Sequence, residues 1–177
     1  MVHAGGMRAC DITLEIDCPP DRFWRLYFDE GFHYDTFVHG LGWGEPTITE
    51  RRQDEREIIR NMSAAPKLEL PAPVAKLISD KLGYREWGRF DRDNSEFHFK
   101  QQTNVFGDRM TIAGRMWGDA LPEGRMRWRT KLTIECTILG VGGLIERAAE
   151  HNVYKAWPEC SKYWNRWLAA HPNAHLE

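Results

Sequence analysis

The strict alternation of residues 125–138 constrains the fold of this chain more than any other feature. Apolar and polar side chains follow one another with a period of two residues, the period of a β-strand. The apolar positions are Met126, Trp128, Leu132, Ile134 and Cys136, and the polar positions are Arg125, Arg127, Arg129, Lys131, Thr133 and Glu135. Such a strand has one face against a core and one against water, so the chain contains a two-faced sheet that another element must cover.

The segment after this strand supplies that cover. Beyond Gly140, Gly142 and Gly143 the apolar pattern becomes helical and stays so until about Ala170. At ~1.5 Å per residue this helix is about 40 Å long. One long helix of this kind is enough to cover one face of a sheet.

The rest of the chain predicts more strands and a few short helices. Residues 8–17 alternate as a first strand does, and the pair Pro19-Pro20 introduces a short helix over Asp21 to Phe28. Residues 31–43 mix aromatic side chains with glycines, which indicates one or two helical turns that run into an aromatic loop. The other predicted elements are strands around 47–49, 57–59, 84–91, 96–104 and 109–117, and a short helix from Val74 to Leu82 closed by Gly83.

This order of elements predicts an α+β chain with a helix-grip fold. In that fold a curved antiparallel sheet, here of about six to seven strands, wraps around a long C-terminal helix, with short helices after the first strand and mid-chain. A chain of 177 residues is served by one core. We therefore expect a loose leader at 1–7, a single domain at 8–170 and a tail at 171–177.

Composition excludes several classes of function. The chain has 24 Lys plus Arg against 26 Asp plus Glu, a net charge of −2, so no broad basic field is available for nucleic acid. No apolar run reaches the ~18 residues of a membrane-spanning helix, and the first residues lack a signal peptide, which predicts a soluble cytoplasmic protein. The cysteines at 10, 18, 136 and 160 lack metal-site spacing, which favours reduced thiols.

The inward-facing positions of the strands are the candidate ligand-binding residues. Methionines opposite aromatic rings adapt to an apolar guest, and two polar side chains among them suit one head group. A filled core has the same pattern, so periodicity alone does not establish a cavity. The candidates are Phe97, Phe99, Gln101, Met110, Ile112, Met116, Trp128, Thr130 and Leu132 from the strands, closed by Leu144, Ile145 and Ala148 from the long helix.

Motifs for catalysis are missing from the sequence. No GxSxG, CxxC, P-loop, GxGxxG or HExxH pattern occurs. His33 and Asp35, with nearby His39, contain the groups of an acid–base site, but the same residues are equally ordinary in a polar loop. We therefore predict no catalytic residues, no metal ligands and no cofactor, and expect a protein that is not an enzyme.

Short segments along the chain resemble known lipid-transfer domains. Residues 23–28, the pair Gly31-Phe32 and the aromatic loop to Trp43 resemble the opening of VASt domains, the sterol-transfer domains of Aster and Lam proteins. The turn at 107–108, the strand with Trp128 and the start of the last helix at 144–146 extend that similarity.

Other segments resemble a second branch of the same START-like (SRPBCC) superfamily. Asn61-Met62, the proline-flanked segment 74–82 and the long final helix are similar to the PRELI phospholipid-transfer family and to a bacterial START-like family of unknown function. Together the two sets of similarities cover about residues 8–168. They depend on the order and spacing of weak motifs, so they indicate the superfamily more strongly than a subfamily.

The resemblance implies non-enzymatic binding of a sterol, a phospholipid or a fatty acid between the sheet and the terminal helix, without a cofactor. The ligand would enter past a mobile lid loop that contains Phe37, Leu41 and Trp43. The chain lacks a membrane tether and its loop carries little basic charge, so transfer between membranes is a weaker expectation than binding, and transient membrane contact is left open. A cyclase or aromatase-type enzyme on the same fold and an interaction module with a filled core remain the alternatives.

Overall fold

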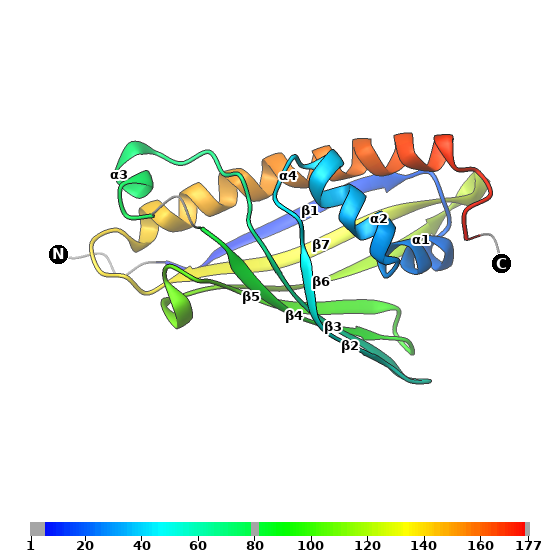
Figure 1. Ribbon diagram of the computed structural model, residues 1–177, viewed down its shortest axis with the longest axis horizontal. Helices are drawn as coiled ribbons and strands as arrows, with labels where there is room; N and C mark the ends of the chain where they lie inside the picture. Colours follow the sequence, from blue (N-terminus) through cyan, green and yellow to red (C-terminus); the bar gives the residue numbers. More distant parts are fainter. Residues whose placement is uncertain (1–5, 79–81, 176–177) are drawn as a thin grey trace.

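A computed structural model describes residues 6–78 and 82–175 of the chain. The order of strands and helices along the chain agrees with the order predicted from the hydrophobic pattern, and Figure 1 shows their arrangement. They are β1 Arg8–Ile16, α1 Pro20–Tyr27, α2 Glu30–Asp35, the π-helix η1 Thr36–Gly40, β2 Thr47–Gln53, β3 Glu57–Ala64, α3 Ala72–Ala75, β4 Tyr84–Asp91, β5 Glu96–Thr103, the 3₁₀ turn η2 Gly107–Arg109, β6 Met110–Leu121, the 3₁₀ turn η3 Pro122–Gly124, β7 Arg125–Cys136 and α4 Gly142–Ala170.

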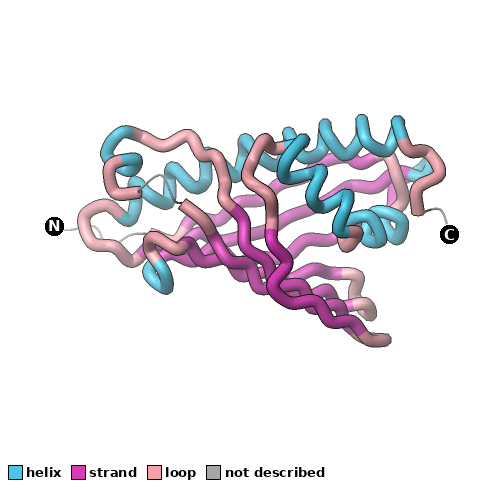
Figure 2. The backbone as a smooth tube through the Cα atoms, in the orientation of Figure 1, coloured by secondary structure: helices cyan, strands magenta, loops and turns pink. Residues whose placement is uncertain are grey.

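The strands form one antiparallel sheet in the order β1-β7-β6-β5-β4-β3-β2. Apart from β1, each strand pairs with its neighbour in the sequence, as short turns require. Figure 2 shows α1, α2 and α4 on one side of the curved sheet. The predicted helix-grip fold is confirmed, with seven strands.

The long helix α4 is anchored on one half of the sheet. It packs mainly on β1 and β7, and Ile145, Trp164 and Leu168 are buried on this side. Near its start the buried Glu146 accepts a hydrogen bond through Oε1 from the Cys136 backbone N–H at 2.9 Å. Because α4 presses on this half, the space over the other half is covered mainly by α1, α2 and η1.

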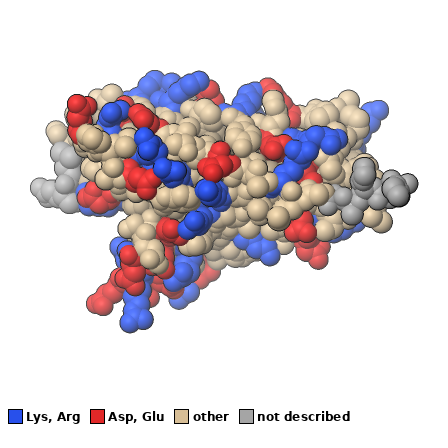
Figure 3. Space-filling model, turned by 180° about the vertical axis from the view of Figure 1, so that it is seen from behind, with Lys and Arg blue, Asp and Glu red and all other residues tan. Residues whose placement is uncertain are grey.

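The outer face of the sheet is polar and its charges are paired. Arg125 contacts Glu15, Arg129 contacts Asp119 and Lys131 contacts Asp11, at 3.0, 2.6 and 3.2 Å. Figure 3 shows Lys and Arg interspersed with Asp and Glu on the face it presents. The basic row of β7 is thus a solvated strand face whose ion pairs with β1 and β6 are individually weak.

Two predicted boundaries were wrong. The strand expected to end near Trp117 continues to Leu121, because β6 pairs with β7 along its whole length. The mid-chain helix is shorter than the predicted Val74–Leu82: α3 covers only Ala72–Ala75, and turns follow to Ile78. Residues 79–81, near the end of the predicted helix, lie outside the described residues.

The segment after α4 is fastened to the first helix. Arg22, 9% exposed, donates hydrogen bonds to the carbonyl oxygens of His171, Pro172 and Ala174, at 2.9–3.1 Å. All three oxygens lie beyond the last residue of α4, where carbonyl groups have no hydrogen-bond partner within the helix. One buried guanidinium therefore ties the start of the 171–177 tail to α1.

Candidate functional site

A cavity of about 190 Å³ lies between the sheet and the helices. Its floor is built from β3, β4, β5, β6 and one residue of β7, and its cover comes from α1, α2, η1 and the middle of α4. The lining is mostly apolar, and aromatic rings contribute much of it. The space between the sheet and the helices is therefore not completely filled, which favours a cavity over a solid core.

Six of the predicted strand residues lie on the cavity wall. Methionines and aliphatic side chains dominate this set, with one amide among them. They are Phe99, Gln101, Met110, Ile112, Met116 and Leu132. The alternation along β5, β6 and β7 was the signal for these positions, because every second residue of a strand faces the same side.

Three other predicted strand residues lie in the packed core instead. Trp128 and Thr130 of β7 are completely buried under α4, where Trp128 Nε1 donates to Thr130 Oγ1 at 3.0 Å. Phe97 is also completely buried, because its ring fills the space above Gly88, where an added Cβ would lie 2.2 Å from the ring. These side chains face the predicted side, but neighbouring groups leave no void beside them.

The predicted helix residues Leu144, Ile145 and Ala148 do not line the cavity either. They belong to the first turns of α4, which pack near the ends of β1 and β7. The lining stripe of the helix begins at Ala149, directly after Ala148, and includes the short side chain of Ala156. The α4 lining residues are Ala149, Asn152, Val153, Ala156, Trp157, Cys160 and Trp164.

The predicted lid residues Phe37, Leu41 and Trp43 all line the cavity. Phe37 belongs to the π-helix η1, and the backbone N–H groups of Leu41 and Trp43 donate to the Thr36 and Phe37 carbonyls. A hydrogen bond of 3.0 Å from Trp164 Nε1 to Thr36 Oγ1 fastens this segment to α4. The helical turns expected here therefore extend to Gly40, and the aromatic loop after them, with Leu41 and Trp43, is held to η1 by these hydrogen bonds.

A buried ion pair lies on the wall of the cavity and was not predicted. Arg60 of β3 and Glu86 of β4 both line it, with side chains 2% and 7% exposed and 3.7 Å between Nη2 and Oε1. Gln101 donates to Glu86 Oε2 at 2.7 Å, and the Arg60 guanidinium lies 4.6 Å from the centre of the Tyr27 ring. Aromatic faces and an amide thus compensate part of the cost of burying two charges.

His33 of α2 completes this polar cluster. Its Nδ1 lies 3.4 Å from Arg60 Nη1, which also donates to the Tyr27 carbonyl at 2.8 Å. Burial and, secondly, the Arg60 charge lower the pKa of His33 to about 2, so the ring is neutral at physiological pH. The sequence analysis considered His33 together with Asp35 and His39 as an acid–base group. Asp35 Oδ1 and the exposed His39 Nε2 lie 4.0 Å apart, and neither residue lines the cavity.

Three polar atoms of the cluster remain without a hydrogen-bond partner among the described residues. They are His33 Nε2, Arg60 Nε and Glu86 Oε1. Buried polar atoms are nearly always hydrogen-bonded, since an unmade bond costs about 1–3 kcal/mol. Because these atoms belong to residues of the cavity wall, a polar group inside the cavity can supply the missing hydrogen bonds.

The sequence did contain a signal for this cluster. Arg60 sits between Ile58 and Met62 on the apolar phase of its strand, and Glu86 shares its phase with Gly88 and Phe90. A charged residue at a buried position of an alternating strand needs a partner. The two charges are near one another because β3 and β4 pair antiparallel, which places Arg60 opposite Gly88 and Glu86 opposite Met62.

The other titratable groups of the wall stay neutral. Burial raises the pKa of the Tyr27 and Tyr84 phenols and raises the pKa of the Cys160 thiol to about 12, which makes that thiol unreactive. All four cysteines are free and buried. Over the described ranges, no group of three or more His, Cys, Asp or Glu side chains is placed to hold a metal ion, and no helix is long and apolar enough to cross a bilayer.

The order of the elements and the topology of the sheet define a START-like helix-grip fold. The chain belongs to the family described as "Protein of unknown function (DUF2505)", which matches residues 11–168. No curated protein sequence matches the chain.

Several solved structures share this fold. The Zhui aromatase/cyclase from a Streptomyces species has a TM-score of 0.64 at 11% identity, over 96% of this chain and 98% of that one. A START superfamily protein from Mycobacterium smegmatis has a TM-score of 0.59 at 10% identity, over 92% and 99%. Ara h 8.0201 also has a TM-score of 0.59, at 7% identity, over 90% and 98%. The narrower resemblance to VASt and PRELI domains stays a prediction.

Proposed function

We propose that this protein binds a small hydrophobic molecule in the cavity between the sheet and α4, without converting it. The observation that carries the proposal is the cavity itself, about 190 Å³, whose mostly apolar wall includes a polar cluster with unpartnered atoms. Burial of an apolar body would supply the affinity, at ~25 cal/mol per Å² before the costs of binding. The fold it shares with a START superfamily protein supports this class of function.

The volume limits the size of the ligand. Pockets for drug-sized molecules measure about 300–1,000 Å³, whereas an apolar cavity of about 150 Å³ holds benzene. At about 190 Å³ the cavity suits one or two aromatic rings or a medium aliphatic chain. A sterol or a phospholipid would require the segment with Phe37, Leu41 and Trp43 to move outward.

Native mass spectrometry of the purified protein, followed by solvent extraction, tests the proposal. Ala156→Phe, which fills the cavity from α4, should abolish any bound mass, and Ala169→Phe on the exposed end of the same helix is the matched control. We expect a stoichiometric small molecule on the wild-type protein and on the control. A wild-type protein that carries no ligand, and whose melting temperature no alcohol, phenol or fatty acid raises, would contradict the proposal.

A cyclase or aromatase-type enzyme is the second candidate. His33 Nε2 and Glu86 Oε1 favour it, because an imidazole nitrogen and a carboxylate oxygen that lack hydrogen bonds on the wall of one cavity are the groups of an acid–base site. A structure of the same fold is named an aromatase/cyclase. The two functions separate when the extracted ligand is incubated with fresh protein: an unchanged mass and NMR spectrum supports binding, and a conversion lost in His33→Gln supports the enzyme.

A further inference from the structure

We infer that the polar cluster on the cavity wall recognises an uncharged hydroxyl group, so that the ligand is an alcohol or phenol with an apolar body. This inference rests on the proposed binding function and names its ligand class. It depends on two observations, the charge balance of the cluster and the donor and acceptor roles of its unpartnered atoms.

The charge of the cluster is already balanced. Of the described residues that line the cavity, only Arg60 and Glu86 carry a full charge, and they compensate one another at 3.7 Å. His33 is buried and neutral, and Gln101 is an amide. A carboxylate, phosphate or ammonium group on the ligand would bring a third charge into a buried site without a counter-charge, which costs several kcal/mol.

The unpartnered atoms include both a donor and an acceptor. A guanidinium only donates, so the His33 Nδ1 that faces Arg60 Nη1 at 3.4 Å must accept. The proton of the neutral ring is then on Nε2, which makes that unpartnered atom a donor, while the unpartnered Glu86 Oε1 is an acceptor. Arg60 Nε is a second free donor.

A hydroxyl group fits this arrangement because it accepts one hydrogen bond and donates another. It can accept from His33 Nε2 or Arg60 Nε and donate to Glu86 Oε1. A carboxylate can only accept, so it would leave Glu86 Oε1 unpaired and repel it. An ammonium group can only donate, so it would leave the His33 and Arg60 donors unpaired.

Matched probes with one apolar body test the inference on the wild-type protein. We would measure dissociation constants at pH 7.5 for 2-naphthol, 2-naphthoate and naphthalene, and for 1-octanol and octanoate, by isothermal titration calorimetry. The expected result is that each alcohol binds at least about tenfold more tightly than its carboxylate, and that 2-naphthol binds more tightly than naphthalene. One lost hydrogen bond to a buried polar group is enough for such a factor.

Two outcomes are negative and differ from one another. If a carboxylate binds as tightly as its alcohol, or more tightly, the hydroxyl inference is overturned while hydrophobic ligand binding stands. If neither series binds in any form, the proposed function fails and the inference fails with it.

Two variants then assign the selectivity to the cluster. Glu86→Gln leaves the Arg60 charge uncompensated and should reverse the preference in favour of 2-naphthoate, whereas Glu57→Gln, on the outer face of the same two strands, should keep the wild-type order. His33→Phe changes no charge, so it should lower the advantage of 2-naphthol over naphthalene and still exclude 2-naphthoate. A folded Glu86→Gln protein with the wild-type order of affinities, or a folded His33→Phe protein with the wild-type ratio of 2-naphthol to naphthalene affinity, would overturn the assignment.

Discussion

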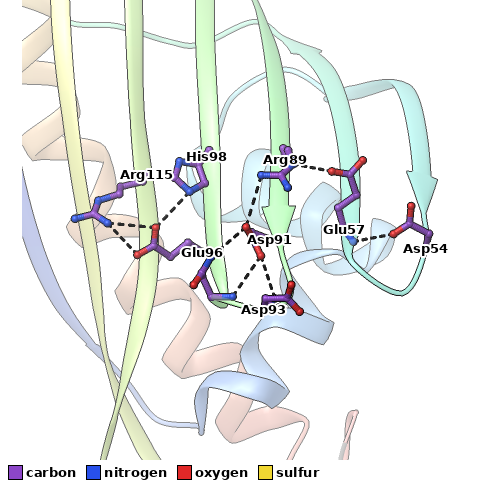
Figure 4. Close-up of polar contacts among 9 residues, drawn as sticks. Asp54, Glu57, Arg89, Asp91, Asp93, Glu96, His98 and Arg115 are labelled. Carbon is purple, nitrogen blue, oxygen red and sulfur yellow. Dashed lines mark hydrogen bonds and ion pairs between the residues drawn. The ribbon is translucent and has the colours of Figure 1, made fainter.

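Arg60 Nη2 lies 3.7 Å from Glu86 Oε1 on the inner face of the sheet, between β3 and β4. The same two strands carry a second pair on the outer face, where Arg89 Nε lies 2.6 Å from Glu57 Oε2, and Figure 4 shows these side chains pointing toward one another. In both pairs the partner lies two residues from the directly opposed position. The pairs differ in environment, since the inner side chains are 2% and 7% exposed and the outer ones 49% and 25%.

This difference predicts unequal effects on stability. Glu86→Gln leaves a buried guanidinium without its counter-charge, and we expect a loss of about 3 kcal/mol in the free energy of unfolding. Glu57→Gln removes a largely solvated pair and should cost less than about 1 kcal/mol. Urea denaturation of the two variants beside the wild type measures both values. Equal losses would mean that the inner pair does not contribute as a buried charge pair.

Gly88, which lies opposite Arg60 in the β3–β4 pair, leaves no room for a side chain. A Cβ at Gly88 would lie 2.2 Å from the Phe97 ring and 2.9 Å from the Arg60 carbonyl oxygen. Gly88→Ala should therefore cost about 2 kcal/mol through overpacking. Gly143→Ala in the first turn of α4 meets nothing within 4 Å and should be neutral or slightly stabilising. Thermal unfolding of both variants is the check, and an unchanged melting temperature for Gly88→Ala would contradict this packing.

The fold could be predicted because its signals are local. The alternation of β7 and the long helical pattern of α4 fix a half-buried sheet and its cover, and short turns between strands fix the antiparallel order. The end of α3 was harder to predict, because Pro71 and Pro73 permit a first helical turn without specifying how many turns follow.

The site was predicted only in part, because it depends on how the elements press on one another. Alternation correctly puts Phe99 and Trp128 on the inner face, but only the position of α4 over β1 and β7 decides that Trp128 is packed and Phe99 lines a void. Arg60 and Glu86 are on the apolar phase of their strands. Their pairing follows from the β3–β4 register, which the sequence pattern does not specify to the residue.

The C-terminal attachment gives a further prediction. Arg22→Met removes the buried donor for three carbonyl oxygens after α4, so we expect a loss of about 2 kcal/mol and faster amide hydrogen exchange in residues 171–175. Arg25→Met removes one exposed hydrogen bond to the His175 carbonyl and should have a much smaller effect. Unchanged exchange in Arg22→Met would show that the tail is held by other contacts.

His33 predicts a loss of stability on the acid side of neutrality. Burial and Arg60 lower its pKa to about 2 in the folded protein, whereas an unfolded histidine titrates near ~6.5. Between these two values the unfolded chain binds a proton that the folded chain does not, so stability falls as the pH falls through the unfolded pKa. From pH 7.5 to pH 5.5 this one residue should cost about 1.4 kcal/mol.

The comparison of His33→Gln with the wild type isolates this contribution, since all other titrating groups are shared. Urea denaturation at pH 7.5 and 5.5 should show that the wild type loses about 1.4 kcal/mol more than His33→Gln over this interval, even if the variant is less stable at both values. His39→Gln, at an exposed position of η1, keeps His33 in place and should retain the wild-type difference. If His33→Gln and the wild type lose the same free energy, His33 is not a buried neutral ring, and its assigned role as a donor in the cavity fails as well.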